Sequence, residues 1–242
     1  MAHFYLSDNL AGVSEGDNVA LGASESRHIV TVSRTRAGDA ILLGNGRGVT
    51  VGGTVTAADP AGVVVRVERV ENTARNRQLV MLVQALAKGG RDELAVQAAT
   101  ELGVDAVIPW SAERSVARWD GAKATKGRDR WQSITREATK QSMRAWLPDV
   151  RPIASTSVLT ESASDTRMLV LEPTAKTRLT GITPDGRDLA IVVGPEGGVS
   201  PRELEAFEAA GAEPVRLGTG VLRTSTAGPA ALAVINMILG RW

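Results

Sequence analysis

The sequence predicts an α/β protein in which a small β-barrel precedes a larger domain built on a parallel sheet. Before about residue 70, short apolar segments alternate with Asn-Gly and Gly-Gly pairs, and no long helical pattern intervenes. Such punctuation is typical of the hairpin turns of a small barrel. After residue 78, strand-like apolar runs alternate with helical patterns. These runs are apolar throughout, which indicates a parallel sheet covered by helices on both faces.

The predicted barrel domain spans residues 1–72, and the second domain spans residues 73–242. Residues 39–59, DAILLGNGRGVTVGGTVTAAD, place glycine turns between apolar runs and predict strands joined by hairpins. In residues 62–70, GVVVRVERV, alternate positions are valine, as expected of a half-buried strand. The polar residues 71–78 predict the link to the second domain.

The second domain is expected to alternate strands and helices. Its predicted strands are the apolar runs QLVMLVQAL, DAVIPW, RMLVLEP, DLAIVVGPEGG and EPVRLG. The helix after the first of these runs is expected to bury one face with Leu94, Ala98 and Leu102. Residues 125–146 predict a long basic helix that Pro148 closes. The tail GPAALAVINMILGRW is apolar all round, which predicts a buried helix.

The composition disfavours several kinds of site. The chain has no cysteine and only two histidines, His3 and His28, which argues against disulfides, thiol nucleophiles, zinc sites and a Ser-His-Asp triad. No metal is therefore expected. No apolar stretch reaches the roughly 18 to 20 residues of a membrane helix, and the first residues do not resemble a secretory signal. We expect a soluble, cytoplasmic protein without membrane contact.

Positive charge is concentrated in one segment. The whole chain has a net charge of +1, whereas Arg114 to Arg151 contains ten Lys and Arg residues against four Asp and Glu residues. Three tryptophans, Trp119, Trp131 and Trp146, lie in the same segment. Basic residues interleaved with aromatics suit phosphate contact and base stacking. The same pattern is also typical of a solvated helix face with tryptophans in the core, and both interpretations stay open.

The stretch VVGPEGGVSPRELEAF, residues 192–207, predicts a glycine-rich loop between a strand and a helix. Ser200, Pro201 and Glu203 form a typical helix entry, with a capping hydroxyl, a proline in the first turn and a carboxylate that reaches back. Open α/β sheets bind ligands at such strand ends. The loop contains no lysine, and Glu196 would repel phosphate, so a phosphate-loop nucleotidase is disfavoured.

Two further loops follow predicted strands, LEPTAK at residues 171–176 and LGTGVLRTSTAG at residues 217–228. Together with the glycine-rich loop they could line one pocket that offers backbone N–H and C=O groups. Such a pocket suits a neutral, hydrogen-bonding ring such as adenine. The alternative is that these glycines only make tight turns in a crowded sheet.

These loops resemble the signature of the SPOUT class of RNA methyltransferases, and most of all the 16S ribosomal RNA (uracil-N3)-methyltransferase family, RsmE. The resemblance covers essentially the whole chain in order. It rests on VGPEGGVSPRELEAF, LGTGVLRTSTA, KGGRDELAVQAATELGVDAVIPWSAERSV (88–116), REATKQSMRAWLPDV (136–150) and RHIVTVSRTRAGDAILLGNGRG (27–48). It implies a PUA-like barrel before a methyltransferase domain that contains a C-terminal trefoil knot.

The resemblance also implies the cofactor S-adenosylmethionine and a homodimeric enzyme. The residues that it places around the cofactor are Leu171, Glu172, Gly194, Pro195, Glu196, Gly197, Gly198, Leu217, Gly218, Val221, Leu222 and Thr224. The apolar last helix suits a dimer interface, or else a position in the core. This sequence departs from the family pattern around Gly220 and Ser225, near which an arginine and a glutamate are expected. The departure puts any side-chain role of these two residues in doubt.

The implied reaction is methyl transfer to N3 of one uridine of 16S rRNA in the small ribosomal subunit, near the decoding centre. Arg223 is the candidate catalytic residue, because a fixed positive charge can stabilise the imide anion that forms when N3 loses its proton; it could instead hold a nearby carboxylate. The candidate RNA-binding residues are Arg27, His28, Arg34, Arg36, Lys88, Arg91, Arg114, Arg118, Gln141 and Arg144. The four residues of the barrel could instead belong to an ordinary polar hairpin, Arg114 and Arg144 could form surface or interface pairs, and Gln141 could bind only the dimer partner. Two alternatives stay open: a 2′-O-ribose methyltransferase of the same class, and a non-catalytic RNA-binding protein of ribosome assembly.

Overall fold

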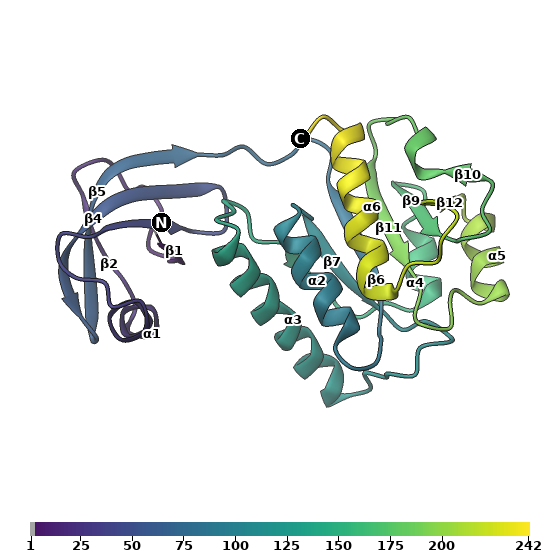
Figure 1. Cartoon of the computed structure of the whole chain (residues 1–242), viewed down its shortest axis with the longest axis horizontal. Helices are drawn as coiled ribbons and strands as arrows, with labels where there is room; N and C mark the ends of the chain where they lie inside the picture. Colours follow the sequence, from purple (N-terminus) through teal and green to yellow (C-terminus); the bar gives the residue numbers. More distant parts are fainter. Residues whose placement is uncertain (1–2) are drawn as a thin grey trace. The chain divides into compact units, whose positions relative to one another are not determined.

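The computed structural model describes residues 3–242 and divides into two compact units (Figure 1). One unit contains the described residues up to Arg75 together with Thr139–Leu147. The other contains Asn76–Ala138 and Pro148–Trp242. The division shows that a short segment from the middle of the chain belongs with the N-terminal residues.

The first unit is built on a five-stranded sheet in the order β1-β3-β4-β5-β2. Its strands are β1 (His3–Leu6), β2 (Asn18–Ala20), β3 (Ala40–Gly44), β4 (Val49–Asp59) and β5 (Gly62–Asn72). All pairs are antiparallel except β1 with β3. The predicted inward valines of β5, Val63, Val65 and Val67, are buried in the core of this unit. Register shifts in β4 at Gly52/Gly53 and Val55/Ala57 mark bulges, which bend a sheet toward a barrel.

Between β2 and β3 the chain forms α1 (Ala23–Arg27) and the single π-turn η1 (His28–Val32). The turn buries Ile29 and leaves Arg27 and His28 exposed. Arg34, just after it, has a φ of 55° in the left-handed region.

The predicted helix over residues 125–146 is wrong at its end. The helix α3 (Ala122–Gln141) stops five residues earlier. Met143 adopts a φ of 53°, a conformation that an α-helix cannot contain.

The segment after α3 packs within the first unit instead. Gly48 N–H donates a hydrogen bond of 2.9 Å to the carbonyl of Ala145, and the Trp146 indole N–H donates one of 2.9 Å to Thr73 O. The Arg75 guanidinium lies 5.6 Å from the centre of the Trp146 ring, within the range of a cation–π contact. These contacts explain why tertiary structure overrides the helical pattern here.

The second unit confirms the predicted parallel sheet. Its seven strands follow the order β10-β12-β9-β11-β6-β7-β8, and every neighbouring pair is parallel. They are β6 (Val80–Ala85), β7 (Ala106–Trp110), β8 (Asp149–Val150), β9 (Thr166–Leu171), β10 (Thr177–Arg178), β11 (Asp188–Val193) and β12 (Glu213–Arg216). The central strands are buried on both faces, as their uniformly apolar sequences predict.

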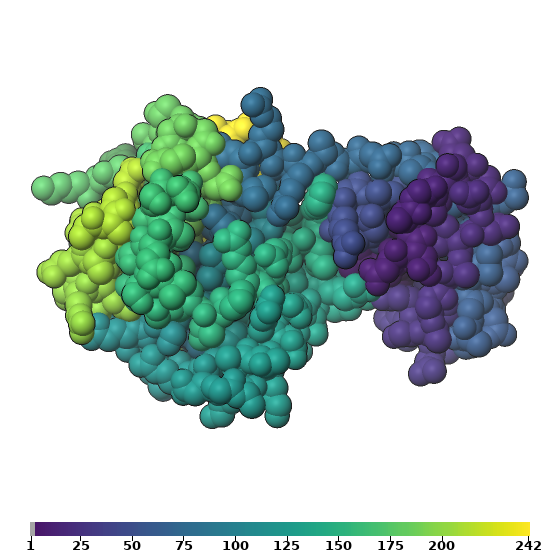
Figure 2. Space-filling model, turned by 180° about the vertical axis from the view of Figure 1, so that it is seen from behind, coloured from purple at the N-terminus to yellow at the C-terminus, as the bar shows by residue number. Residues whose placement is uncertain are grey.

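Helices cover both faces of this sheet (Figure 1). On one face, α2 (Arg91–Glu101), Trp131 of α3 and α6 (Thr224–Ile238) pack on Val80 and Leu82 of β6. On the other, α4 (Thr156–Glu161) and α5 (Pro201–Ala209) pack on Met81 and Val83. Figure 2 shows α5 in yellow-green beside α4 in green on that second face. A one-turn 3-10 helix, η2 (Leu179–Gly181), contacts α6.

Two helix predictions need correction. In α2 the buried side chains include Ala95, Val96 and Ala99, whereas the expected core residue Leu94 is 58% exposed. The helix α6 is not buried all round, because Met237 is 64% exposed. Within residues 3–242, no helix is both long and apolar enough to cross a membrane.

Candidate active site

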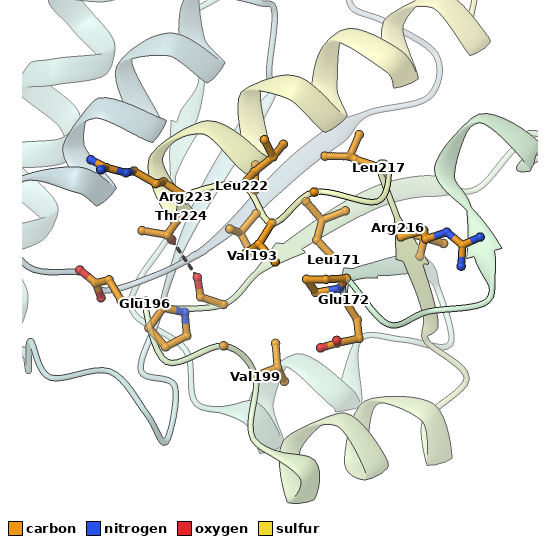
Figure 3. Close-up of a pocket in the computed structure, with 18 of the residues that line it drawn as sticks. Leu171, Glu172, Val193, Glu196, Val199, Arg216, Leu217, Leu222, Arg223 and Thr224 are labelled. Carbon is orange, nitrogen blue, oxygen red and sulfur yellow. Dashed lines mark hydrogen bonds between the residues drawn. The ribbon is translucent and has the colours of Figure 1, made fainter.

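A cavity of about 430 Å³ lies at the carboxyl ends of β9, β11 and β12 (Figure 3). Three loops after these adjacent parallel strands supply most of its wall. The lining residues are Arg91, Leu171, Glu172, Pro173, Val193, Gly194, Pro195, Glu196, Gly198, Val199, Val215, Arg216, Leu217, Gly218, Gly220, Val221, Leu222, Arg223, Thr224 and Ala227. The volume is in the range typical of sites for small molecules.

The loop after β11 doubles back tightly on itself. A Cβ atom added to Gly194 would lie 2.9 Å from Val199 N, so only glycine fits there. Gly198 has a φ of 71°, which favours glycine, and its N–H closes the turn by donating to Pro195 O at 2.9 Å. The predicted capping box of α5 is confirmed: Ser200 Oγ accepts from Glu203 N and Glu203 Oε2 accepts from Ser200 N, both at 3.2 Å.

A buried threonine joins this loop to two other elements. Thr224 Oγ1 at the start of α6 donates to Gly194 O at 2.8 Å, the dashed line in Figure 3. The same oxygen accepts a 2.8 Å hydrogen bond from Nε2 of Gln84, which is fully buried at the end of β6. The beginning of the glycine-rich loop is thereby fixed to the sheet and to the last helix.

Glu196 is held at the edge of the cavity. Its Oε1 accepts hydrogen bonds of 3.0 Å from Lys88 N–H and from Arg91 Nη1. Partial burial acts to raise the pKa of the Glu196 carboxyl, but hydrogen bonds from its own N–H, Lys88 N–H and Arg91 outweigh this and lower the pKa. The carboxyl is therefore ionised at neutral pH.

The rest of the wall combines apolar side chains with free backbone groups. Figure 3 shows Leu171, Val193 and Leu222 close together around the cavity. In the part of the chain that the structure describes, the N–H groups of residues 218–222 make no intrachain backbone hydrogen bond. An apolar slot whose wall includes a loop with N–H groups that have no backbone partner fits a flat heterocycle with hydrogen-bond acceptors, the chemistry expected of an adenine site.

The structure brings the predicted cofactor residues into this one cavity, with one exception. Gly197 does not line it, and instead packs on the Arg114 side chain, whose Cβ would lie 3.3 Å from an added Cβ. The candidate catalytic residue Arg223 lines the cavity at the N-cap of α6. Of the two departures from the family pattern, Gly220 lines the cavity and Ser225 does not.

Sequence reasoning missed Val193, Val215 and Arg216 as lining residues, together with Arg91, for which RNA contact is expected. Pro173, Val199 and Ala227 lie in the predicted loops but are not among the residues named for the cofactor. The signal for Val193 and Val215 is present, since each lies at the end of a strand that leads into one of the loops. No local signal identifies Arg91 as a lining residue, because it follows a different strand and reaches Glu196 only through the fold.

The predicted RNA-binding residues fall into three groups. Arg27, His28, Arg34 and Arg36 are exposed around the π-turn of the first unit. Gln141 and Arg144 lie in Thr139–Leu147, the segment that belongs to the first unit. The remaining four are in the second unit: Lys88, Arg91, Arg114 and Arg118.

Those remaining four residues contact loops. Lys88 and Arg91 bind Glu196 as described above. Arg114 Nη1 donates to Gly197 O at 2.9 Å, and Arg118 Nη1 donates to Ala112 O at 3.1 Å. All four are exposed on the surface of their unit.

Comparison with known proteins agrees with this architecture. A model of the RNA methyltransferase domain matches residues 74–236, and a model of the RNA methyltransferase PUA domain matches residues 21–68. The ribosomal RNA small subunit methyltransferase E of Mycobacterium bovis is 42% identical over 94% of this chain and 89% of its own length. Its namesake from Bacillus subtilis is 32% identical over 98% of this chain and 96% of its own.

Among solved structures, the ribosomal RNA small subunit methyltransferase E from Neisseria gonorrhoeae, crystallised with S-adenosyl methionine, superposes with a TM-score of 0.88. It is 28% identical and covers 98% of both chains. The fold, the PUA domain and the pocket at the strand ends define an RNA methyltransferase. Within that class, the chain belongs to the ribosomal RNA small subunit methyltransferase E family.

Proposed function

We propose that this chain methylates 16S rRNA of the small ribosomal subunit, at N3 of one uridine near the decoding centre, with S-adenosylmethionine as methyl donor. The observation that carries the proposal is the cavity at three neighbouring strand ends, in a chain that belongs to the small subunit methyltransferase E family. The donor set fits the cofactor: free N–H groups at residues 218–222, an apolar slot, and charged side chains at its rim.

The residues proposed to hold the cofactor are those of the three loops. Gly198 and Gly218 admit a ligand close to the backbone, because a Cβ at either position would point into open space and glycine has none. Leu171 and Leu222 provide the apolar surface on which a flat ring packs. When bound, S-adenosylmethionine supplies a methyl group already activated on a sulfonium, so the protein's main contribution is alignment.

Arg223 is the proposed catalytic residue. Uracil N3 becomes a nucleophile only after losing its proton, and the resulting imide spreads negative charge over the two neighbouring carbonyl oxygens. A guanidinium presents several N–H donors with a permanent positive charge, which suits this anion. Arg223 is exposed and lines the cavity from the N-cap of α6, where an incoming base can meet it.

RNA docking is proposed for the first unit, with the boundary between the two functional domains near residue 72. The exposed cluster Arg27, His28, Arg34 and Arg36 contains no acidic residue in its stretch of chain. Such a cluster suits phosphate contacts on structured RNA. Gln141 and Arg144 belong to the same unit, so they extend its set of RNA-facing candidates.

We also propose a homodimer that acts in the cytoplasm. Support for the dimer comes from exposed apolar side chains on two helices that pack together, Leu94 on α2 at 58% and Met237 on α6 at 64% exposed. A knotted arrangement of the last loops also remains part of the family expectation.

The reaction is tested by deleting the gene and measuring modified nucleosides of 16S rRNA by mass spectrometry. Loss of 3-methyluridine, restored by the purified protein and S-adenosylmethionine on small subunits from the deletion strain, is the expected result. Loss of a 2′-O-methyl nucleoside, or no loss at all, contradicts the proposal.

The role of Arg223 is tested with Arg223→Ala in the same assay. Turnover should fall by at least 100-fold because the developing anion loses its cation. The dissociation constant for S-adenosylmethionine, measured by calorimetry, should stay within about twofold. A matching fall in cofactor affinity contradicts a catalytic role and places Arg223 in cofactor binding.

A further inference from the structure

A second loop braces the outer side of the glycine-rich loop. Residues 111–118 follow β7 and do not line the cavity. From this loop, Arg114 Nη1 donates to Gly197 O at 2.9 Å and makes a longer contact of 3.4 Å with Val199 O. Its aliphatic carbons also pack against Gly197. Arg114 therefore contacts the back of a turn whose other side lines the cavity through Gly198 and Val199.

The neighbouring residue Glu113 reinforces this brace. Its Oε2 accepts a 2.6 Å hydrogen bond from Ser200 Oγ, and its N–H donates at 2.8 Å to Oε1 of Glu203. Glu203 is only 5% exposed, and Thr156 Oγ1 donates to the same Oε1 at 2.9 Å. The carboxylate that caps α5 thus also holds the 111–118 loop in place.

Arg118 stabilises the 111–118 loop through hydrogen bonds to the loop's own carbonyl groups. Its Nη1 donates to Ala112 O and its Nη2 to Glu113 O, both at 3.1 Å. These bonds fold the 111–118 loop on itself and hold the carbonyl groups of Ala112 and Glu113, directly before Arg114. A preorganised brace reduces the ordering cost that a ligand must otherwise meet.

We infer that Arg114 is a positioning residue for the cofactor: it holds the Gly194–Val199 turn in its binding shape by donating to the turn's carbonyl oxygens. The inference rests on the proposal that S-adenosylmethionine binds in the cavity. It assigns Arg114 a role inside its own unit, in place of the RNA contact expected from its charge. Without Arg114, the carbonyl oxygens of Gly197 and Val199 would accept hydrogen bonds from solvent water. Residues 197–199 would then be free to move.

The first test measures the turn itself, without any ligand. In Arg114→Ala, the backbone amides of Gly194 and of residues 196–200 should exchange hydrogen at least fivefold faster than in the unchanged protein. Arg202→Ala is the matched control, because Arg202 is an exposed arginine on α5 outside the cavity and should leave exchange unchanged. Equal exchange in Arg114→Ala and the unchanged protein overturns the inference.

The second test separates positioning from RNA contact. Calorimetry with S-adenosylmethionine and no RNA should show about tenfold weaker binding by Arg114→Ala, which is about 1.4 kcal/mol. Arg114→Lys, which keeps one charged donor but not the planar fork, should lose about two- to fivefold. The KM for the cofactor should rise more than kcat falls.

An unchanged cofactor affinity together with a raised KM for RNA overturns the inference in favour of RNA contact. If Arg114→Ala does not fold, Arg114→Lys decides both measurements. If the unchanged protein itself fails to bind S-adenosylmethionine, the proposed function falls, while hydrogen exchange still decides whether Arg114 holds the turn.

Discussion

At the residue scale, the pocket depends on hydrogen bonds that hold the glycine-rich loop. The Thr224 hydroxyl donates to Gly194 O and the Arg114 guanidinium to Gly197 O, while the Lys88 backbone N–H and the Arg91 guanidinium donate to the Glu196 carboxylate. A loop rich in glycine has high backbone entropy when unfolded, so it requires such contacts to hold one shape. The polar residues around the cavity therefore stabilise the shape of the glycine-rich loop before any ligand binds.

The ionisation of Glu196 makes the stability of the folded protein depend on pH. Because the pKa of the folded carboxyl is below its ordinary value of 4.5, ionised Glu196 stabilises the folded protein at pH values above 4.5. This stabilisation is lost as the pH falls through the lower pKa of the folded state. Thermal unfolding of Glu196→Gln and the unchanged protein should therefore differ above pH 4.5 and converge at more acid pH.

The matched control is Glu208→Gln, which removes an exposed carboxylate of α5 outside the cavity and keeps the ion pair between Glu196 and Arg91. A difference between Glu196→Gln and the unchanged protein that grows as the pH falls would contradict the ion pair with Arg91.

At the element scale, the beginning of α5 sets the end of the loop. Ser200 Oγ accepts from Glu203 N and donates to Glu113, so one hydroxyl caps the helix and holds a second loop. The hydroxyl is buried, since Ser200 is only 3% exposed. Its removal leaves polar groups of the helix end and of Glu113 without that partner.

Ser200→Ala should lower the free energy of unfolding by about 1–2 kcal/mol, measured by urea denaturation. It should also weaken S-adenosylmethionine binding, because residues 194–199 lose one fixed end. The matched variant is Ser155→Ala, which removes the N-cap of α4 outside the cavity. It should cost no more than about 1 kcal/mol and leave cofactor affinity unchanged; equal effects of the two variants on affinity would contradict the link.

At the scale of the whole molecule, the basic cluster proposed for RNA docking and the cofactor pocket belong to different compact units. The net charge of +1 conceals an exposed basic cluster in the first unit, whereas the cavity lies in the second. Phosphate contacts release counterions, so their number determines how steeply binding depends on salt. The two activities are therefore expected to respond to separate substitutions.

Replacing Arg27, Arg34 and Arg36 together by Gln should reduce the magnitude of the slope of log K against log salt for 16S rRNA binding by about 2 to 3. Filter binding at several salt concentrations measures the slope, and calorimetry should show unchanged affinity for S-adenosylmethionine. Arg66→Gln, at an exposed arginine of β5 that is not part of the 27–36 cluster, serves as the control in the same unit. An unchanged slope in the triple variant would contradict RNA docking by this cluster.

Local sequence determined the elements and the chemistry of the loops. The alternating valines of β5, the apolar runs of the parallel strands and the capping box at Ser200 are all short-range patterns, and each is present as predicted. The family resemblance likewise rests on contiguous motifs, so it identified the class before any contact was known. The predictions of the buried face of α2 and of the last residue of α3 were wrong, because tertiary packing decides both and a local sequence pattern does not contain it.

Only the tertiary structure decided which distant residues serve the pocket. The strand order β12-β9-β11-β6 differs from the order along the chain, and it brings the loops after β9, β11 and β12 together. The bonds that hold the glycine-rich loop join residues 83 apart for Arg114 and Gly197 and 105 apart for Arg91 and Glu196. The charge of these arginines is visible in the sequence, but their partners depend on the order of the strands, because contacts across a sheet are set by strand neighbours and not by nearness along the chain.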